Sequence, residues 1–147
     1  MKLSEWLLPE FDQEMANTRK TLERVQMENP DWKPHKKSMP LGYMARHIAT
    51  LPDWITETIA HETWDIAPLE GEKYQVPDAS STEEILALFD KATARARAAI
   101  AEVSDEHMTK TWSLLAGGKA IFTLPRFSMV RSLLNHGIHH RAQLGVY

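Results

Sequence analysis

Apolar residues recur at helical spacing in four long stretches of the chain. In residues 3–27, and in a stretch that starts near 38–40, they return every three, four or seven positions, and charged residues occupy the other faces. The same period runs through residues 82–103 and from Pro125 towards the end of the chain. We therefore expect four amphipathic helices. The first apolar stripe consists of Leu3, Leu7, Phe11, Met15, Leu22 and Val25.

Turn-forming residues separate the predicted helices. Asn29 and Pro30 end the first helix, and a linker runs to Ser38, the expected N-cap of a second helix that fades near Trp64. Residues 66–80 form a loop that is long for a compact bundle. The third helix should begin after Ser80-Ser81, because a capping hydroxyl there precedes two glutamates in the first turn.

A short insertion precedes the last helix. Residues 104–107 suggest a turn or a short helix, and the apolar runs 111–115 and 120–123 flank the glycine pair 117–118, which predicts a hairpin. A two-stranded ribbon is marginal alone, so it should pack on the helices. We predict an all-α fold for the single domain 1–147, a four-helix bundle with a small hairpin insertion before the last helix.

Composition narrows the classes of partner. The 147 residues carry a net charge of −3 with acids and bases interspersed, so there is no basic field for nucleic acid or an anionic membrane. Glu5 and Glu10 interrupt the N-terminal apolar stretch, which excludes a signal peptide, and no run is long enough to span a membrane. We predict a soluble cytoplasmic protein. We also expect the native chain to continue past Tyr147, since the last helix lacks a clear cap.

Histidines supply the strongest chemical signal. Three of the seven fall within residues 136–140, and in a helix His136 and His140 lie one turn apart on the same face. His47, on the flank of the second helix's apolar stripe, is the candidate third ligand. Since cysteine is absent, a transition-metal site must use histidines and carboxylates, and imidazoles suit Zn, Ni, Fe or Cu. We predict a divalent-metal site at His47, His136 and His140 if the three meet; chance placement of the pair is the alternative.

Neighbouring residues receive weaker predictions. His139 lies about 60° further round the last helix and is expected to be solvated or to support a ligand histidine indirectly. Arg141 should pair with an acid rather than touch substrate, and Trp54, two turns after His47, is a candidate pocket residue. Gly137 costs about 1 kcal/mol of helix stability relative to Ala. We therefore expect a neighbouring group to approach the helix backbone closely at this position.

No acid–base residue can be assigned. Asp53, Glu57 and Asn135 are open candidates for orienting the ligand imidazoles. The chain lacks the paired Glu-x-x-His motifs of di-metal bundles, and 61–65 has aspartate where a zincin has its second histidine. Serine-hydrolase, phosphate-loop and dinucleotide motifs are absent.

The chain resembles the DinB/YfiT-like family of metal-dependent enzymes over essentially its whole length. The resemblance lies in residues 41–51 with His47, in the motif His136-x-x-x-His140-Arg141-x-Gln143-Leu144, and in the four-helix layout with Trp112 in the insertion. It implies helices in up-down-down-up order and a divalent metal, often Zn or Ni, on the three matching histidines. Relatives include S-transferases and isomerases that use low-molecular-weight thiols, and many form homodimers.

Two function hypotheses follow. In the first, the protein is a metal-dependent transferase or hydrolase in which the metal activates a small thiol or water towards a small electrophile. In the second, it is a non-catalytic dimeric bundle, a binding or stress-response module whose histidines are structural. Three histidines with an open coordination position favour the enzyme, and a closed or empty site favours the second hypothesis.

Overall fold

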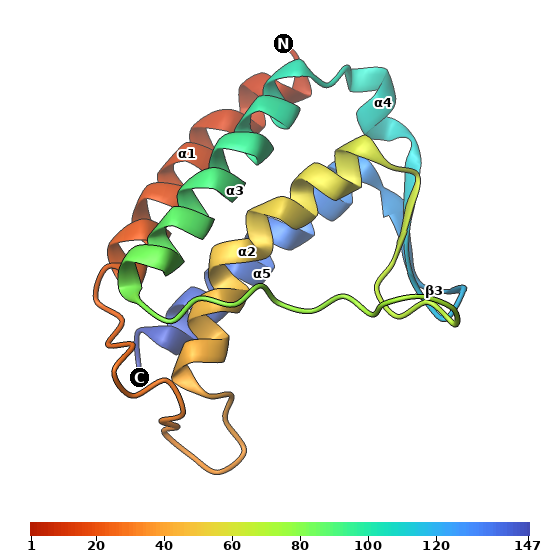
Figure 1. The fold of residues 1–147 in the computed structure, drawn as a ribbon. Helices are drawn as coiled ribbons and strands as arrows, with labels where there is room; N and C mark the ends of the chain where they lie inside the picture. Colours follow the sequence, from red (N-terminus) through yellow and green to blue (C-terminus); the bar gives the residue numbers. More distant parts are fainter.

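Four long helices form the body of the molecule. The computed structural model describes residues 1–147, and its long helices are α1 (Leu3–Leu22), α2 (Leu41–Ala60), α3 (Thr82–Glu102) and α5 (Arg126–Leu144). Helices α1 and α5 run in one direction and α2 and α3 in the other, which is the expected up-down-down-up order (Figure 1). Helix α2 contacts α3 and α5, and α1 contacts the same two helices, so the four close into a bundle.

The long connection after α2 explains this order. It carries the chain from the end of α2 back to the end at which α2 began, so that α3 starts there and runs parallel to α2 (Figure 1). Helix α3 then begins as the sequence predicts, because Ser81 Oγ accepts a hydrogen bond from the backbone N–H of Glu84 at 3.1 Å. Helix α1 ends earlier than expected, and the buried residues Val25 and Met27 lie in the irregular segment that follows it.

The prediction of an all-α four-helix bundle is wrong in one respect. The fold has a fifth, short helix, α4 (Asp105–Thr109), and a three-stranded sheet in the order β1 (Thr63–Asp65), β2 (Thr111–Ala116), β3 (Lys119–Pro125). The predicted hairpin is present as β2 and β3, which pair antiparallel. Strand β1 pairs parallel with β2. Three residues carry no readable period, and their partner lies far along the chain, so the sequence gives no local sign of β1.

Asp65 ties β1 to the turn of the hairpin. Its carboxylate accepts hydrogen bonds from the backbone N–H groups of Ala67 at 3.0 Å, Gly117 at 3.2 Å and Gly118 at 2.7 Å. The two glycines adopt positive φ values of 59° and 74°, which residues with a Cβ atom rarely adopt. The sheet and its turn are thereby held as one unit at the end of α2.

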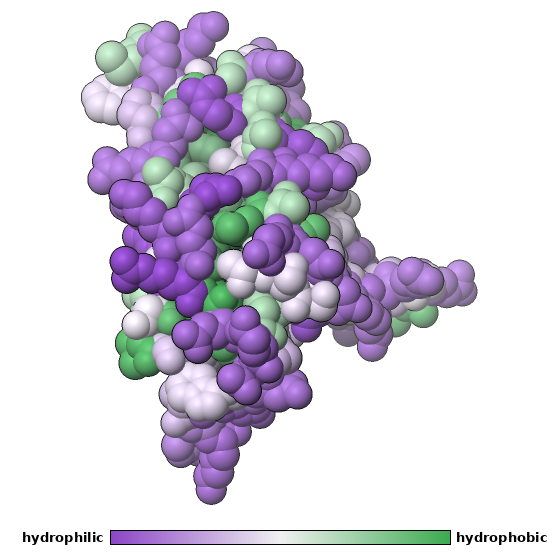
Figure 2. All heavy atoms as spheres, turned by 60° about the vertical axis from the view of Figure 1, so that its left-hand side comes forward, coloured by the Kyte–Doolittle hydropathy of each residue, from purple (hydrophilic) through white to green (hydrophobic).

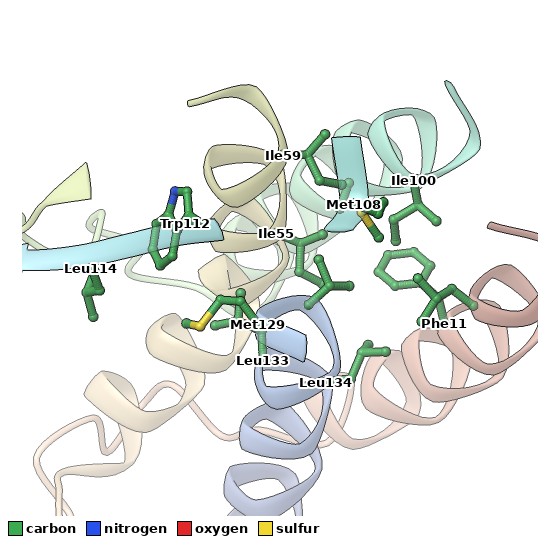
Figure 3. Close-up of a cluster of buried hydrophobic side chains, with 13 residues drawn as sticks. Phe11, Ile55, Ile59, Ile100, Met108, Trp112, Leu114, Met129, Leu133 and Leu134 are labelled. Carbon is green, nitrogen blue, oxygen red and sulfur yellow. The ribbon is translucent and has the colours of Figure 1, made fainter. Parts of the chain in front are cut away.

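Two apolar clusters fill the bundle. The larger lies at the end of the bundle that carries the sheet and draws on α1, α2, α3, α4, α5 and β2 (Figure 3). The smaller lies towards the other end, between α1, α2, α3 and the last turn of α5. The residues labelled in the larger cluster are Phe11, Ile55, Ile59, Ile100, Met108, Trp112, Leu114, Met129, Leu133 and Leu134.

A buried arginine joins the ends of α2 and α5. Arg126, the first residue of α5, is 2% exposed, and its guanidinium donates to four backbone carbonyls. Two belong to Thr58 and His61 at the end of α2, at 3.0 and 2.8 Å, and two to Lys110 and Thr111 at the start of β2, at 3.3 and 3.1 Å. This single side chain donates to carbonyls from two separate segments, and it fixes α5 against the end of α2.

The outer surface is mainly hydrophilic on the face seen in Figure 2, with apolar atoms in separate small patches and the sheet region projecting to one side. Large apolar side chains are exposed on β3 at Ile121 (48%) and Phe122 (53%). None of the helices combines the length and the apolar character that a membrane-crossing segment requires.

Candidate metal centre

Helices α2 and α5 bring three histidines together. The pattern that buries one face of each helix places His47 of α2 and His136 and His140 of α5 at their contact. The Nε2 atom of His136 lies 3.3 Å from Nε2 of His47 and 3.1 Å from Nε2 of His140. One nitrogen from each residue falls within 4.8 Å of the other two. The sequence-predicted ligand set is therefore assembled in space.

The surroundings favour the neutral form of two of these imidazoles, those of His47 and His136. Burial, together with repulsion from the neighbouring His140 and His136, lowers the pKa of His47 from 6.5 to about 4, because a second positive charge so close is unfavourable. Burial also lowers the pKa of His136, with added repulsion from His140 and His139. A neutral imidazole has a free lone pair, which is the form that binds a metal ion.

In each ring Nε2 faces the cluster and Nδ1 is the outer nitrogen, and the histidines differ in whether Nδ1 has a hydrogen-bond partner. His140, which is 8% exposed, has its Nδ1 atom 2.7 Å from Oε1 of Gln143, one helical turn further along α5. The Nδ1 atom of His47 is buried and has no hydrogen-bond partner. The ring of Tyr43 lies parallel to that of His47, with 6.1 Å between centroids and 10° between planes. His47 is thus held by packing, and His140 by packing and a hydrogen bond.

The other predicted site residues have different environments. His139 is exposed, and its ring meets that of His140 edge-on at 5.1 Å between centroids. Arg141 pairs with the carboxylate of Glu14 at 2.6 Å and donates to the Glu14 backbone carbonyl at 3.1 Å, so the expected acid partner is found. This pair ties the last turns of α5 to α1, next to His140.

Trp54 belongs to an aromatic cluster. Its ring packs edge-on against Trp64 of β1 at 4.6 Å and against Tyr74 of the long connection at 5.4 Å, both measured between centroids. Two helical turns, about 10 Å along α2, separate it from His47. The cluster fastens the connection to the bundle, and a role for Trp54 in a pocket stays a prediction.

The side chain that contacts a histidine of the cluster is Gln143, which the sequence analysis named only as part of the family motif. Of the three candidates proposed for orienting the imidazoles, Asp53 pairs with Arg95 at 2.7 Å and Glu57 lies 3.3 Å from His61, and Asn135 makes no side-chain hydrogen bond to a histidine. The signal available in the sequence was spacing, because an amide three residues after a helical histidine lies on the same face.

The donor set fits a divalent transition metal. Ligand nitrogens about 2.0–2.1 Å from a tetrahedral zinc ion lie about 3.3 Å apart, close to the 3.3 and 3.1 Å separations found here. Only three protein ligands converge, which leaves at least one coordination position for water or another molecule. Imidazole ligands suit Zn, Ni, Cu or Fe rather than Mg or Ca.

Known proteins share this fold. A DinB-like protein from Bacillus subtilis superposes with a TM-score of 0.72 at 16% identity, covering 97% of this chain and 89% of its own. A DinB-like protein from Bacillus cereus gives a TM-score of 0.72 at 24% identity, with 97% and 88% covered. No curated protein matches the chain. The family model of the DinB superfamily matches residues 10–144, and the chain therefore belongs to the DinB superfamily.

Proposed function

We propose that the protein binds one divalent metal ion, Zn or Ni, through Nε2 of His47, His136 and His140. The observation that carries the proposal is the convergence of three imidazole nitrogens from two helices at separations of 3.1 and 3.3 Å. These separations match those between nitrogen ligands of one tetrahedral zinc ion, which supports a shared metal over a chance encounter of the rings. The negative end of the α5 dipole, in whose last turns His140 lies, also favours a cation by about 0.3–1 kcal/mol.

We further propose that the site is catalytic. When bound, a divalent ion supplies Lewis acidity and lowers the pKa of a coordinated thiol or water. The chain's own residues hold three ligands and leave the exposed side of His136 open to solvent, so a small thiol and a small electrophile have access. Transfer of the thiol to the electrophile, or hydrolysis of the electrophile, is the reaction class that fits. A homodimer is part of this proposal.

The second candidate is a non-catalytic bundle with a structural metal. The tight packing around His47 and His140 favours it, because rigid and partly buried ligands also suit a permanent ion. The two candidates differ in whether the fourth position exchanges. A structural zinc site is closed by four protein ligands, and a catalytic one keeps a position for water or substrate.

Metal content tests the first step. Elemental mass spectrometry on tag-free protein should give about one Zn or Ni per chain for wild type and none for His136→Ala. His139→Ala is the matched control, because His139 is the adjacent histidine outside the cluster, and it should retain the metal. Absence of metal from wild type after dialysis against Zn and Ni would refute the metal site.

Cobalt substitution tests the open position. After reconstitution with Co²⁺, adding 2-mercaptoethanol should change the visible spectrum and produce a thiolate-to-cobalt charge-transfer band if the thiol enters the coordination sphere. A spectrum unaffected by thiol, cyanide and azide would mean a closed site and would favour the structural candidate. Analytical ultracentrifugation of the same samples tests the homodimer.

A further inference from the structure

We propose that Gln143 is a positioning residue that fixes the tautomer of His140. The Oε1 atom of Gln143 lies 2.7 Å from Nδ1 of His140, and His140 Nε2 faces Nε2 of His136 at 3.1 Å. A carbonyl oxygen only accepts hydrogen bonds, so the ring proton sits on Nδ1 and the lone pair on Nε2. The consequence for metal affinity rests on the proposed metal site, whereas the tautomer itself does not.

The opposite orientation of the Gln143 amide is chemically possible, and an experiment can distinguish the two orientations. If the amide of Gln143 were turned round, its NH₂ group would donate to Nδ1 and the ring proton would move to Nε2. That proton would lie between the three converging nitrogens and block the lone pair that a metal needs. The oxygen-inward orientation leaves the NH₂ group of this exposed side chain free to bind water.

Burial makes His140 the histidine that depends on such a partner. It is 8% exposed, whereas His136 is exposed enough for water to reach its ring. His47 has a buried Nδ1 without any partner, so no hydrogen bond at that nitrogen selects its tautomer. Gln143 therefore supplies the only protein hydrogen bond to an outer nitrogen of the three rings. Removing it leaves a buried nitrogen unpartnered and both tautomers accessible.

The experiment reads the tautomer directly in metal-free protein. Long-range ¹H–¹⁵N correlation spectra of ¹⁵N-histidine-labelled protein at pH 8 separate a protonated from an unprotonated nitrogen, and His140→Asn identifies the His140 signals. Gln143→Leu removes the acceptor, Gln143→Glu retains it, and Gln13→Leu, at an exposed position on α1, is the matched control. Zinc affinity is measured on the same four proteins by competition with a chromogenic chelator.

We expect wild type, Gln143→Glu and Gln13→Leu to hold His140 with the proton on Nδ1. Gln143→Leu should mix the tautomers and bind zinc 10- to 100-fold more weakly, as is usual when the hydrogen-bond partner of a ligand histidine is lost. A proton on Nε2 in wild type, or an unchanged tautomer in Gln143→Leu, overturns the positioning role. If wild type shows the expected tautomer but binds no zinc, the positioning role stands and the metal proposal fails.

Discussion

Alanine at position 137 should stabilise the protein and leave the three-histidine cluster unchanged. Gly137 lies between the two ligand histidines of α5 and does not have a positive φ. A Cβ atom built there has Leu51 Cδ1 as its nearest neighbour, at 3.9 Å, which is ordinary van der Waals contact. Gly137 also lines a small apolar space of about 20 Å³ among the four long helices. No close approach requires glycine at this position, contrary to the expectation from sequence.

Two contributions determine how much Gly137→Ala should raise the free energy of unfolding. Alanine in place of glycine in a helix interior contributes about 1 kcal/mol, mainly because the unfolded chain loses less conformational freedom on folding. A partly buried methyl group adds some fraction of about 0.8 kcal/mol. We therefore expect Gly137→Ala to raise the free energy of unfolding by about 1–1.5 kcal/mol, or the Tm by about 3–5 °C for a chain of this size.

Gly42→Ala is the matched comparison, since both glycines are helical. At position 42 a Cβ atom would lie 2.8 Å from Pro30 Cβ and 3.3 Å from its backbone Cα and O atoms, and the Gly42 N–H donates to Pro30 O at 2.8 Å. The backbone cannot move away without breaking that hydrogen bond. We expect a net destabilisation of about 1–3 kcal/mol despite the same gain in helix propensity.

Urea unfolding of metal-free protein, followed by circular dichroism, measures both changes, and zinc titration measures the effect on the site. Gly137→Ala should bind zinc with wild-type affinity, because its methyl group points towards Leu51. A lower free energy of unfolding for Gly137→Ala, or a tenfold loss of zinc affinity, would refute the reasoning. Either result would mean that the helices come closer at this point than the 3.9 Å contact indicates.

Three further predictions concern single side chains. Since the pKa of His47 is about 4 in the folded protein and about 6.5 in the unfolded chain, the unfolded chain binds more protons between these values, so stability present above pH 6.5 is lost as the pH falls towards 4. In metal-free protein His47→Gln should lessen this loss by roughly 2 kcal/mol, after allowance for partial exposure, in urea titrations at pH 4.5 and 7.5; identical pH profiles would contradict the assignment. Arg126→Met should cost about 3 kcal/mol, because four carbonyls lose the guanidinium donor and only Lys110 O keeps a second one, the backbone N–H of residue 126, whereas Arg95→Met at an exposed ion pair should cost under 1 kcal/mol; equal costs in thermal unfolding would contradict this. Asp65→Ala should cost about 1–3 kcal/mol and speed amide exchange at the hairpin turn while the long helices stay protected; unchanged exchange in the turn would show that Asp65 does not hold it.

Local pattern determined the helical body of this protein. Four stretches with a period near 3.6 predicted four helices, and the period decides the face that each helix buries. Capping also acts locally, as Ser81 at the start of α3 illustrates. The one-turn spacing of His136 and His140 is likewise a property of a single helix, so their proximity could be predicted before any tertiary contact was known.

Tertiary structure decided the contacts between segments that lie far apart in the sequence. The meeting of His47 with His136 requires α2 and α5 to pack side by side in one register, and 89 residues separate the two positions. The pairing of β1 with β2 and the four carbonyls around Arg126 arise in the same way. Helical period constrains which face of a helix is buried, but packing of whole helices selects the neighbour and the register. The three-histidine site exists because that register aligns two helices that the sequence describes only one at a time.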